Sequence, residues 1–369
     1  MTAISLATLD TPALLIDLDI VGRNLERMQK KADKHSATLR PHIKTHKIPE
    51  LALMQTRLGA LGVTVAKISE AEIMAEAGID DIFIANQVVT EEKINRLAAL
   101  AKKVQLSVGM DSIAAARRVS DIFAAAGLEI DYLIEIDSGL NRCGVSPGRD
   151  AVEFYQAINA LPSLRFKGIF THAGQVYGAG SLSEVKKLSL LESRIMAHTA
   201  LAFGEVGTSP DVVSVGSTPT MKVWQGHESV NEIRPGNYIF HDAIQISLGV
   251  ATVEECALSV VATVISRPAR ERAVIDGGSK AFSSDRGAHR KEMASGFGIV
   301  LGNKATLERL SEEHGIMSLD PDEDLDVGDR VRIIPNHACA VVNLFDRAYG
   351  IRNDEVVEEF KIAARGKSQ

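Results

Sequence analysis

Hydrophobic positions recur with two alternating periods along roughly the first two thirds of the chain. Short apolar runs are followed by longer amphipathic ones, as in residues 21–33, where Val21, Leu25, Met28 and Ala32 share one helical face. Strands are expected at residues 11–19, 38–44, 62–67, 81–86, 104–110, 131–137, 166–172 and 211–215. Helices are expected at residues 21–33, 48–58, 69–77, 91–102, 112–126, 149–161 and 183–203. This alternation predicts an α/β fold with a parallel sheet.

The number of expected strands favours a closed barrel. Without the strand at residues 11–19, and with residues 232–241 as a further strand, the parallel set reaches about eight, the number that closes a (β/α)₈ TIM-like barrel. A doubly wound open sheet is the competing architecture. The first strand–helix turn has no Gly-x-Gly-x-x-Gly fingerprint, which weakens a nucleotide-binding interpretation of that alternative.

The pattern changes after about residue 244, where few helical periods occur. Strand-like runs are then separated by Gly, Pro and Asp, at residues 257–267, 272–276, 315–319, 330–335, 347–352 and 355–362. This predicts a second, mostly antiparallel β domain. The strand at residues 11–19 has no evident barrel partner and is assigned to that domain. The expected domains are therefore residues 22–243 for the barrel and residues 1–21 plus 244–369 for the β domain.

Composition and charge narrow the class of protein. With 45% hydrophobic, 24% charged and 5% aromatic residues, the chain has the make-up of a soluble globular protein. A net charge of -7 argues against nucleic acid or an anionic membrane as partner. Cys143, Cys256 and Cys339 are few and widely spaced, which favours a reducing compartment. Because the chain also lacks a long apolar run and a signal-peptide pattern, we expect a cytoplasmic protein.

The first candidate for chemistry is a cluster of bases after the expected strand at residues 38–44. The cluster contains Arg40, His42, Lys44, His46 and Lys47. Catalytic groups of a barrel lie at the C-terminal ends of its strands. A lysine among cations there has its ammonium form destabilised, and its neutral amine can form a Schiff base. A solvated basic run is the alternative.

Two glycine-containing turns, after the expected seventh and eighth strands, form a candidate phosphate site. Gly216 and Gly236 allow close backbone approach, and Ser217 and Thr218 supply hydroxyl groups. Phosphate sites recur at this position in barrels. Ordinary turn chemistry is the alternative for each turn alone.

A third candidate is a metal site at His337 and Cys339, which follow the expected strand at residues 330–335. Two residues apart on a strand end, the side chains are expected to point the same way. An imidazole and a thiolate suit Zn²⁺ and leave coordination positions open. The alternative is a buried cysteine beside a histidine with ordinary hydrogen bonds.

Taken in order, these motifs resemble those of the pyridoxal 5′-phosphate (PLP) enzymes of fold type III, which have an alanine-racemase-like barrel. The resemblance is strongest to the branch of D-serine dehydratase, D-threo-3-hydroxyaspartate dehydratase and D-threonine aldolase. It spans the chain from about Thr11 onward. It rests on residues 40–47, 141–145, 171–174, 213–220 and 335–339.

The resemblance implies a role for each matching residue. Lys44 is the expected Schiff-base lysine and proton-transfer group, Arg142 is expected near the phenolic oxygen of PLP, and Arg234 near its pyridine nitrogen. The expected phosphate-binding residues are Gly216, Ser217, Thr218, Gly236 and Asn237. The residues expected to line the pocket are His172, Gln175 and Tyr177, with His172 and Tyr177 as further catalytic candidates. The expected metal ligands are His337 and Cys339, with zinc preferred and manganese or magnesium as alternatives.

The implied function is that of a PLP- and metal-dependent lyase acting on D-β-hydroxy amino acids. The His-x-Cys pair favours the dehydratase outcome, which is α,β-elimination to a 2-oxo acid and ammonia. Aldolase-type cleavage to glycine and an aldehyde is the alternative, and a racemase or a non-catalytic PLP-binding protein is more distant. The resemblance also implies a homodimer.

Overall fold

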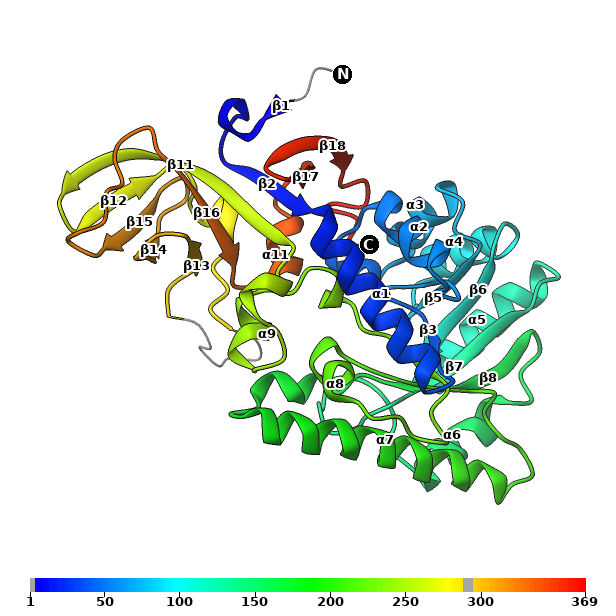
Figure 1. Cartoon of the computed structure of the whole chain (residues 1–369). Coiled ribbons are helices and arrows are strands. Elements are labelled where there is room, and N and C mark those ends of the chain that lie inside the picture. Colours follow the sequence, from blue (N-terminus) through cyan, green and yellow to red (C-terminus); the bar gives the residue numbers. More distant parts are fainter. Residues whose placement is uncertain (1–3, 288–294) are drawn as a thin grey trace.

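The computed structural model describes residues 4–287 and 295–369, and its first sheet consists of eight parallel strands (Figure 1). They are β3 (Thr38–Leu39), β4 (Val63–Val65), β5 (Asp81–Ile84), β6 (Gln105–Met110), β7 (Ile130–Ile136), β8 (Leu164–Thr171), β9 (Val212–Val215) and β10 (Glu232–Ile233). Their order is β3-β10-β9-β8-β7-β6-β5-β4. A parallel bridge between His42 and Thr64 links the β3 side to β4 and closes the ring. The predicted TIM-like barrel is confirmed.

Helices alternate with the barrel strands, and the hydrophobic periods indicated all of them except the short helix at residues 218–223. They are α1 (Leu18–Lys34), α2 (Pro49–Arg57), α3 (Ile68–Glu76), α4 (Glu91–Ala101), α5 (Ile113–Ala125), α6 (Arg149–Ile158), α7 (Leu182–Gly204) and α8 (Thr218–Val223). In α1, the Asp17 carboxylate caps the N-terminus by accepting from the backbone N–H of Asp19 at 3.1 Å and of Ile20 at 2.9 Å. Val21 and Leu25 then face the core, so α1 covers the junction between the two sheets (Figure 1).

The second sheet has ten strands and is mostly antiparallel. Its strands are β1 (Ile4–Ser5), β2 (Ala13–Asp17), β11 (Leu258–Ala269), β12 (Arg272–Ile275), β13 (Gly298–Leu301), β14 (Ala305–Leu310), β15 (Gly315–Leu319), β16 (Arg330–Pro335), β17 (Arg347–Arg352) and β18 (Glu355–Lys361). β2 pairs antiparallel with β11 and parallel with β17. Strands from the N-terminal and C-terminal segments therefore share one sheet. The short helices α9 (Ala243–Ser247), α10 (Ser279–Phe282) and α11 (Ala338–Val342) connect parts of this region.

The structure corrects the expected strands at residues 38–44 and 232–241. Each has only two strand residues and then turns into a 3₁₀ helix, η2 (Ile43–Thr45) or η4 (Asn237–Ile239). Pro41 and Pro235 have no N–H to extend the ladder. Both segments instead bring their following turns to the rim of the barrel. β13 and β14 were not predicted at all.

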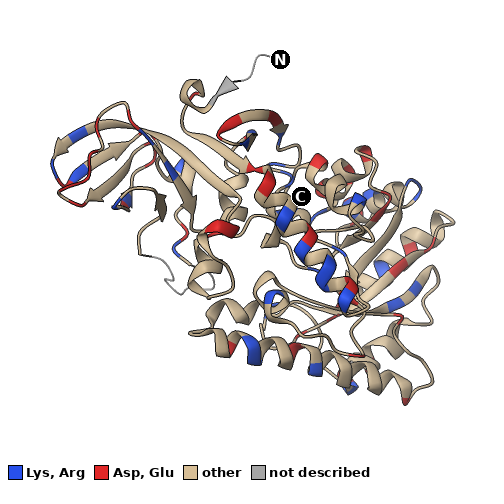
Figure 2. Ribbon diagram, viewed as in Figure 1, with Lys and Arg blue, Asp and Glu red and all other residues tan. Residues whose placement is uncertain are grey.

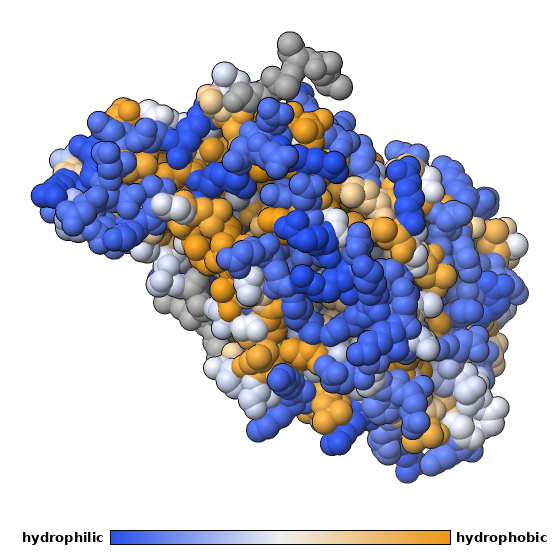
Figure 3. Space-filling view, viewed as in Figure 1, coloured by the Kyte–Doolittle hydropathy of each residue, from blue (hydrophilic) through white to orange (hydrophobic). Residues whose placement is uncertain are grey.

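The surface is mixed in character. Figure 2 shows acidic and basic residues interspersed on the elements of both sheets, and the face in Figure 3 is largely hydrophilic with scattered hydrophobic groups. Among the described residues, no helix has the length and apolar character required to span a bilayer.

Candidate active site

A cavity of about 730 Å³ lies where the C-terminal ends of the barrel strands face the second sheet. Every predicted site residue except Gln175 lines it. The additional lining residues are His42, Thr45, Ala66, Ala85, Asn86, Gln87, Glu135, Cys143, Phe170, Asp242, Ile244, Gln245, Asp285 and Gly287. The Gln175 carboxamide instead donates to the backbone oxygen of Ser138 at 2.8 Å, outside the cavity lining. The cavity thus joins the three candidate sites of the sequence into one.

The cluster of bases is divided by the fold, because only His42 and Lys44 line the cavity. Arg40 points away from it and pairs with Glu232 and Asp81. His46 is fully buried, with Nδ1 accepting from the Ile48 N–H at 3.1 Å. The Lys47 ammonium donates to Asn343 at 2.9 Å.

Arg40, His46 and Lys47 are therefore structural residues. The chemistry predicted for this cluster concerned Lys44 alone, which does line the cavity.

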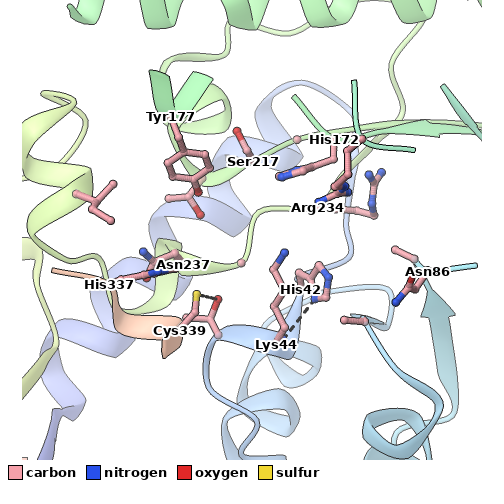
Figure 4. A pocket seen from close by; sticks show the side chains of 18 of the residues that line it. His42, Lys44, Asn86, His172, Tyr177, Ser217, Arg234, Asn237, His337 and Cys339 are labelled. Atoms are coloured by element: carbon pink, nitrogen blue, oxygen red, sulfur yellow. Dashed lines mark hydrogen bonds between the residues drawn. The ribbon is translucent and has the colours of Figure 1, made fainter. Parts of the chain in front are cut away.

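Lys44 extends from η2 toward the space between Arg234, His172 and Asn237 (Figure 4). Burial is the largest effect that lowers the pKa of Lys44. Arg142 and Arg234 lower it further, against opposition from Cys339 and Glu70. Lys44 consequently carries a neutral amine over a wider pH range than an ordinary lysine.

The two histidines beside Lys44 are held in the neutral form. Burial and the charge of Lys44 lower the pKa of both His42 and His172 well below the ordinary value, and Arg234 adds to the effect. His42 also accepts from the Lys44 backbone N–H at 3.4 Å, which caps η2 (Figure 4). Neither histidine therefore adds a positive charge beside Lys44.

Arg234 is fixed rigidly in the middle of the barrel rim. Its guanidinium donates to the Ser214 hydroxyl and to the Thr171 backbone oxygen. Its Cζ atom lies 5.8 Å and 5.2 Å from the ring centres of Phe83 and Phe170. A guanidinium held in this way presents a fixed cation to a ligand.

Arg142, on the loop after β7, is more exposed and less firmly held than Arg234. Its side chain is 50% exposed and lies 3.6 Å from the Glu135 carboxylate. Arg142 therefore combines a partial anchor with access to the cavity.

The turns after β9 and β10 fit a phosphate group. A Cβ on Gly216 would lie 3.0 Å from the Arg234 backbone nitrogen, and one on Gly236 would lie 3.0 Å from the His42 oxygen. The Thr218 hydroxyl is buried without a hydrogen-bond partner among the described residues. A buried hydroxyl group without a partner, beside two glycines that allow close backbone approach, suits an anion. Ser217 caps α8 and lines the same cradle.

Tyr177 lies in the 3₁₀ helix η3 (Gly174–Gly178), on the side of the cavity that also carries His337 (Figure 4). Burial, followed by the nearby Cys339 and Asp242, raises the pKa of Tyr177. Tyr177 is therefore a neutral phenol that can donate a hydrogen bond.

His337 and Cys339 both face the cavity, but they do so from a helix start. His337 is the N-cap residue of α11 and Cys339 lies in its first turn, so the expected strand geometry is corrected. Burial would lower the pKa of His337, but hydrogen bonds with Asp285 and Cys339 raise it to about 11. Burial favours the protonated thiol of Cys339, but His337, Thr45 and Lys44 lower its pKa overall.

The chemistry of this pair fits a divalent metal. A cysteine with a lowered pKa approaches the thiolate form that metals bind, and an imidazole nitrogen is its common companion.

Asp242 is a cavity-lining residue that the sequence analysis did not single out. Its Oδ2 accepts from the Asn237 amide at 2.6 Å and from the Ala338 backbone N–H at 2.9 Å, and its Oδ1 accepts from the Gln245 backbone N–H at 3.1 Å. This buried carboxylate ties the turn after β10 to the turn that carries His337. Its contact with Ala338 spans 96 residues of sequence, so no local pattern could reveal it.

Comparison with known proteins finds a family match for each of the two parts of the chain. Residues 16–243 match the family model of the N-terminal domain of alanine racemase, and residues 257–351 match that of a putative serine dehydratase domain. The chain is 34% identical over 371 residues to a D-threonine aldolase of Arthrobacter sp, covering 99% of this chain and 95% of the relative. It is 35% identical over 374 residues to D-threo-3-hydroxyaspartate dehydratase of Delftia sp. strain HT23, covering 97% and 98%.

Two solved structures of a D-threo-3-hydroxyaspartate dehydratase superpose on the chain with TM-scores of 0.90 at 34% identity. They cover 97% of this chain and 96% and 98% of theirs. One has alanine in place of a histidine. The other, in the metal-free form, has alanine in place of a cysteine two positions later.

Proposed function

The chain belongs to the fold-type III PLP enzymes of the D-serine dehydratase, D-threo-3-hydroxyaspartate dehydratase and D-threonine aldolase family, and from this premise we propose a dehydratase activity on D-β-hydroxy amino acids. As a member of this family it is a PLP-dependent lyase. The observation that carries the dehydratase proposal is the placement of Cys339 beside His337 in the cavity of Lys44.

We propose that Lys44 binds the cofactor through its amine. The lowered pKa of Lys44 supports this role, because the neutral amine is the reactive form. The cradle of Gly216, Ser217, Thr218, Gly236 and Asn237 would hold the phosphate. Arg142 would lie near the phenolic oxygen, and Arg234 would face the pyridine nitrogen and disfavour its protonation.

His337 and Cys339 would hold a divalent metal, with zinc as the proposed ion. The same histidine–cysteine spacing in the two dehydratase mutants supports this pair, since the cysteine mutant is described in the metal-free form. Manganese and magnesium are the alternatives, but both prefer oxygen ligands over a thiolate.

Bound PLP supplies an electron sink for charge at the substrate Cα, and the metal supplies a Lewis acid for the β-hydroxyl. Lys44 is the group placed to take the proton from Cα. His172 stays neutral and adds no charge beside Lys44, and Tyr177 can donate a hydrogen bond as a neutral phenol. The hydroxyl would leave with a proton as water, and hydrolysis of the resulting free enamine would give a 2-oxo acid and ammonia.

Aldolase-type cleavage is the second candidate, because the D-threonine aldolase relative is 34% identical and covers 99% of this chain. In that case the β-hydroxyl loses its proton, the Cα–Cβ bond breaks, Cα takes up a proton, and glycine and an aldehyde result. The two outcomes share Lys44 and the proposed cofactor-binding residues, whereas the pairing of Cys339 with His337 favours the dehydratase.

The test is incubation of PLP- and zinc-loaded protein with D-serine, D-threonine and D-threo-3-hydroxyaspartate, with 2-oxo acid and glycine measured in the same samples. We expect 2-oxo acid without glycine from wild type. The Lys44→Ala variant should lose about 10²–10⁴-fold in turnover, whereas the exposed Lys102→Ala control should match wild type. Glycine with an aldehyde would replace the dehydratase proposal by the aldolase one, and neither product would contradict both.

We also propose the domain division at residues 22–243 and 1–21 plus 244–369, which the two sheets support. The three free cysteines support a cytoplasmic location.

We further propose a homodimer, which the family resemblance implies. Light scattering coupled to size-exclusion chromatography tests this oligomeric state.

A further inference from the structure

A carboxylate from a distant loop contacts His337 at its inner ring nitrogen. Asp285 lies just after α10, and its Oδ2 is 2.8 Å from Nδ1 of His337. Both residues line the cavity. With Nδ1 engaged by Asp285, Nε2 is the nitrogen that His337 has left for a ligand.

We propose that Asp285 is a positioning residue for the metal site, which holds His337 in the tautomer and orientation that direct Nε2 to the metal. This inference rests on the proposed role of His337 and Cys339. Asp285 does not itself bind the metal in this proposal, and it acts only through the histidine.

The loop that carries Asp285 is tied to the chain next to His337. The buried Asn336 side chain donates from Nδ2 to the backbone oxygens of Asp285 and Gly296, both at 2.9 Å. The backbone N–H of Asp285 also donates to the Ser283 hydroxyl at 3.2 Å. Asn336 therefore holds the backbone of the loop, and the next residue, His337, contacts the carboxylate of Asp285.

This double attachment distinguishes the contact from an incidental surface ion pair. Asp285 and His337 side chains are 43% and 34% exposed, and two mobile side chains at such exposure gain little from pairing alone. Here Asn336 holds the backbone of the loop. The Asp285 carboxylate is therefore already positioned for contact with His337. A carboxylate on the far nitrogen of a ligand histidine fixes the ring and raises its basicity, and its loss typically costs about 10–100-fold in metal affinity.

The experiment measures Zn²⁺ affinity of the full-length PLP-loaded protein by competition with a chromogenic chelator. We expect Asp285→Ala to weaken Zn²⁺ binding by about 10–100-fold. Asp285→Asn should lie between wild type and Asp285→Ala, because the amide oxygen can accept from Nδ1 but carries no charge. The exposed neighbour Ser284→Ala should bind Zn²⁺ like wild type.

A second readout separates positioning from ligation. Saturating Zn²⁺ should return Asp285→Ala to near wild-type turnover, whereas His337→Ala should stay inactive. Equal Zn²⁺ affinity of wild type and Asp285→Ala, with an unchanged melting temperature, would overturn the inference alone. Absence of Zn²⁺ binding in wild type would overturn the proposed metal site itself, so the two failures are distinguishable.

Discussion

At the scale of single residues, the reactivity of Lys44 depends on the charges that surround it. Arg142 and Arg234 disfavour its ammonium form, and Cys339 and Glu70 favour it. Burial is the largest effect and acts in the same direction as the arginines. Opposing neighbours allow the pKa of one lysine to be moved in either direction by substitution.

This balance predicts the pH dependence of cofactor capture by the apoprotein. Because the pKa of Lys44 is lowered, the rate of PLP capture should rise with pH and level off below the ordinary lysine value of 10.5. Arg142→Met removes a cation and should move the midpoint upward, whereas Glu70→Gln removes an anion and should move it downward. Well below the midpoint, the fraction of neutral amine changes about tenfold when the pKa of Lys44 changes by one.

The measurement is stopped-flow absorbance during mixing of apoprotein with PLP across a pH series. If the pH midpoints of PLP capture coincide in wild type, Arg142→Met and Glu70→Gln, neighbouring charges do not set the reactivity of Lys44.

At the scale of elements, α7 supports the phosphate cradle from behind. Glu192 on α7 accepts from the Gly216 backbone N–H at 2.9 Å. Burial raises the pKa of Glu192 to about 7, although hydrogen bonds with Gly216 and Thr220 oppose the shift. A helix outside the barrel thereby places a carboxyl group that is protonated below neutral pH next to the candidate phosphate site.

Glu192 should therefore make stability depend on pH. A pKa raised above the unfolded value of 4.5 means that the contribution is fully present below pH 4.5 and is lost as pH rises through about 7. Glu192→Gln keeps an acceptor for Gly216 but does not titrate. The free energy of unfolding of wild type should therefore fall relative to Glu192→Gln between about pH 5 and about pH 8.

Urea unfolding at several pH values measures this difference, with the exposed Glu205→Gln as control. Wild-type and Glu192→Gln curves that run parallel across the range would contradict the prediction.

At the scale of the whole molecule, the barrel is held together at the end opposite the cavity by a charge network. Arg40 donates to both oxygens of Asp81, at 2.6 and 3.2 Å, and to Glu232 at 2.8 Å. Glu232 also accepts from Ser214 at 2.6 Å, and Ser214 contacts Arg234. The network joins the residue after β3 to β5, β9 and β10, and it reaches Arg234 through Ser214.

Arg40→Met should therefore destabilise the protein strongly, because it leaves two carboxylates without their cation. The Glu232 side chain is only 4% exposed, and loss of one partner of a buried pair costs about 3–5 kcal/mol. The matched control is Arg149→Ala, which breaks a pair whose side chains are 89% and 58% exposed and should cost at most about 0.5 kcal/mol. Free energies of unfolding from urea titration test the pair, and equal losses in the two variants would contradict the argument.

The sequence alone was sufficient for the barrel, the mostly antiparallel second sheet and about half of the residues that line the cavity. The hydrophobic periods of helices and strands are local, so they can be recognised without tertiary information. Lys44 and Gly216 were found because they lie at the ends of expected strands, and strand ends meet at one face of a barrel. The role of Arg234 was expected only from the resemblance to the family. β13 and β14 were missed because short strands with Gly and Asn between them leave little periodic signal.

Only the tertiary structure decided which members of each motif act together. It separated Lys44 from Arg40, His46 and Lys47, and it moved Gln175 out of the cavity lining. It also brought Asp242 to Ala338 and Asp285 to His337, contacts that span 96 and 52 residues of sequence. Such contacts have no local period, because they exist only once the barrel and the second sheet have packed against each other.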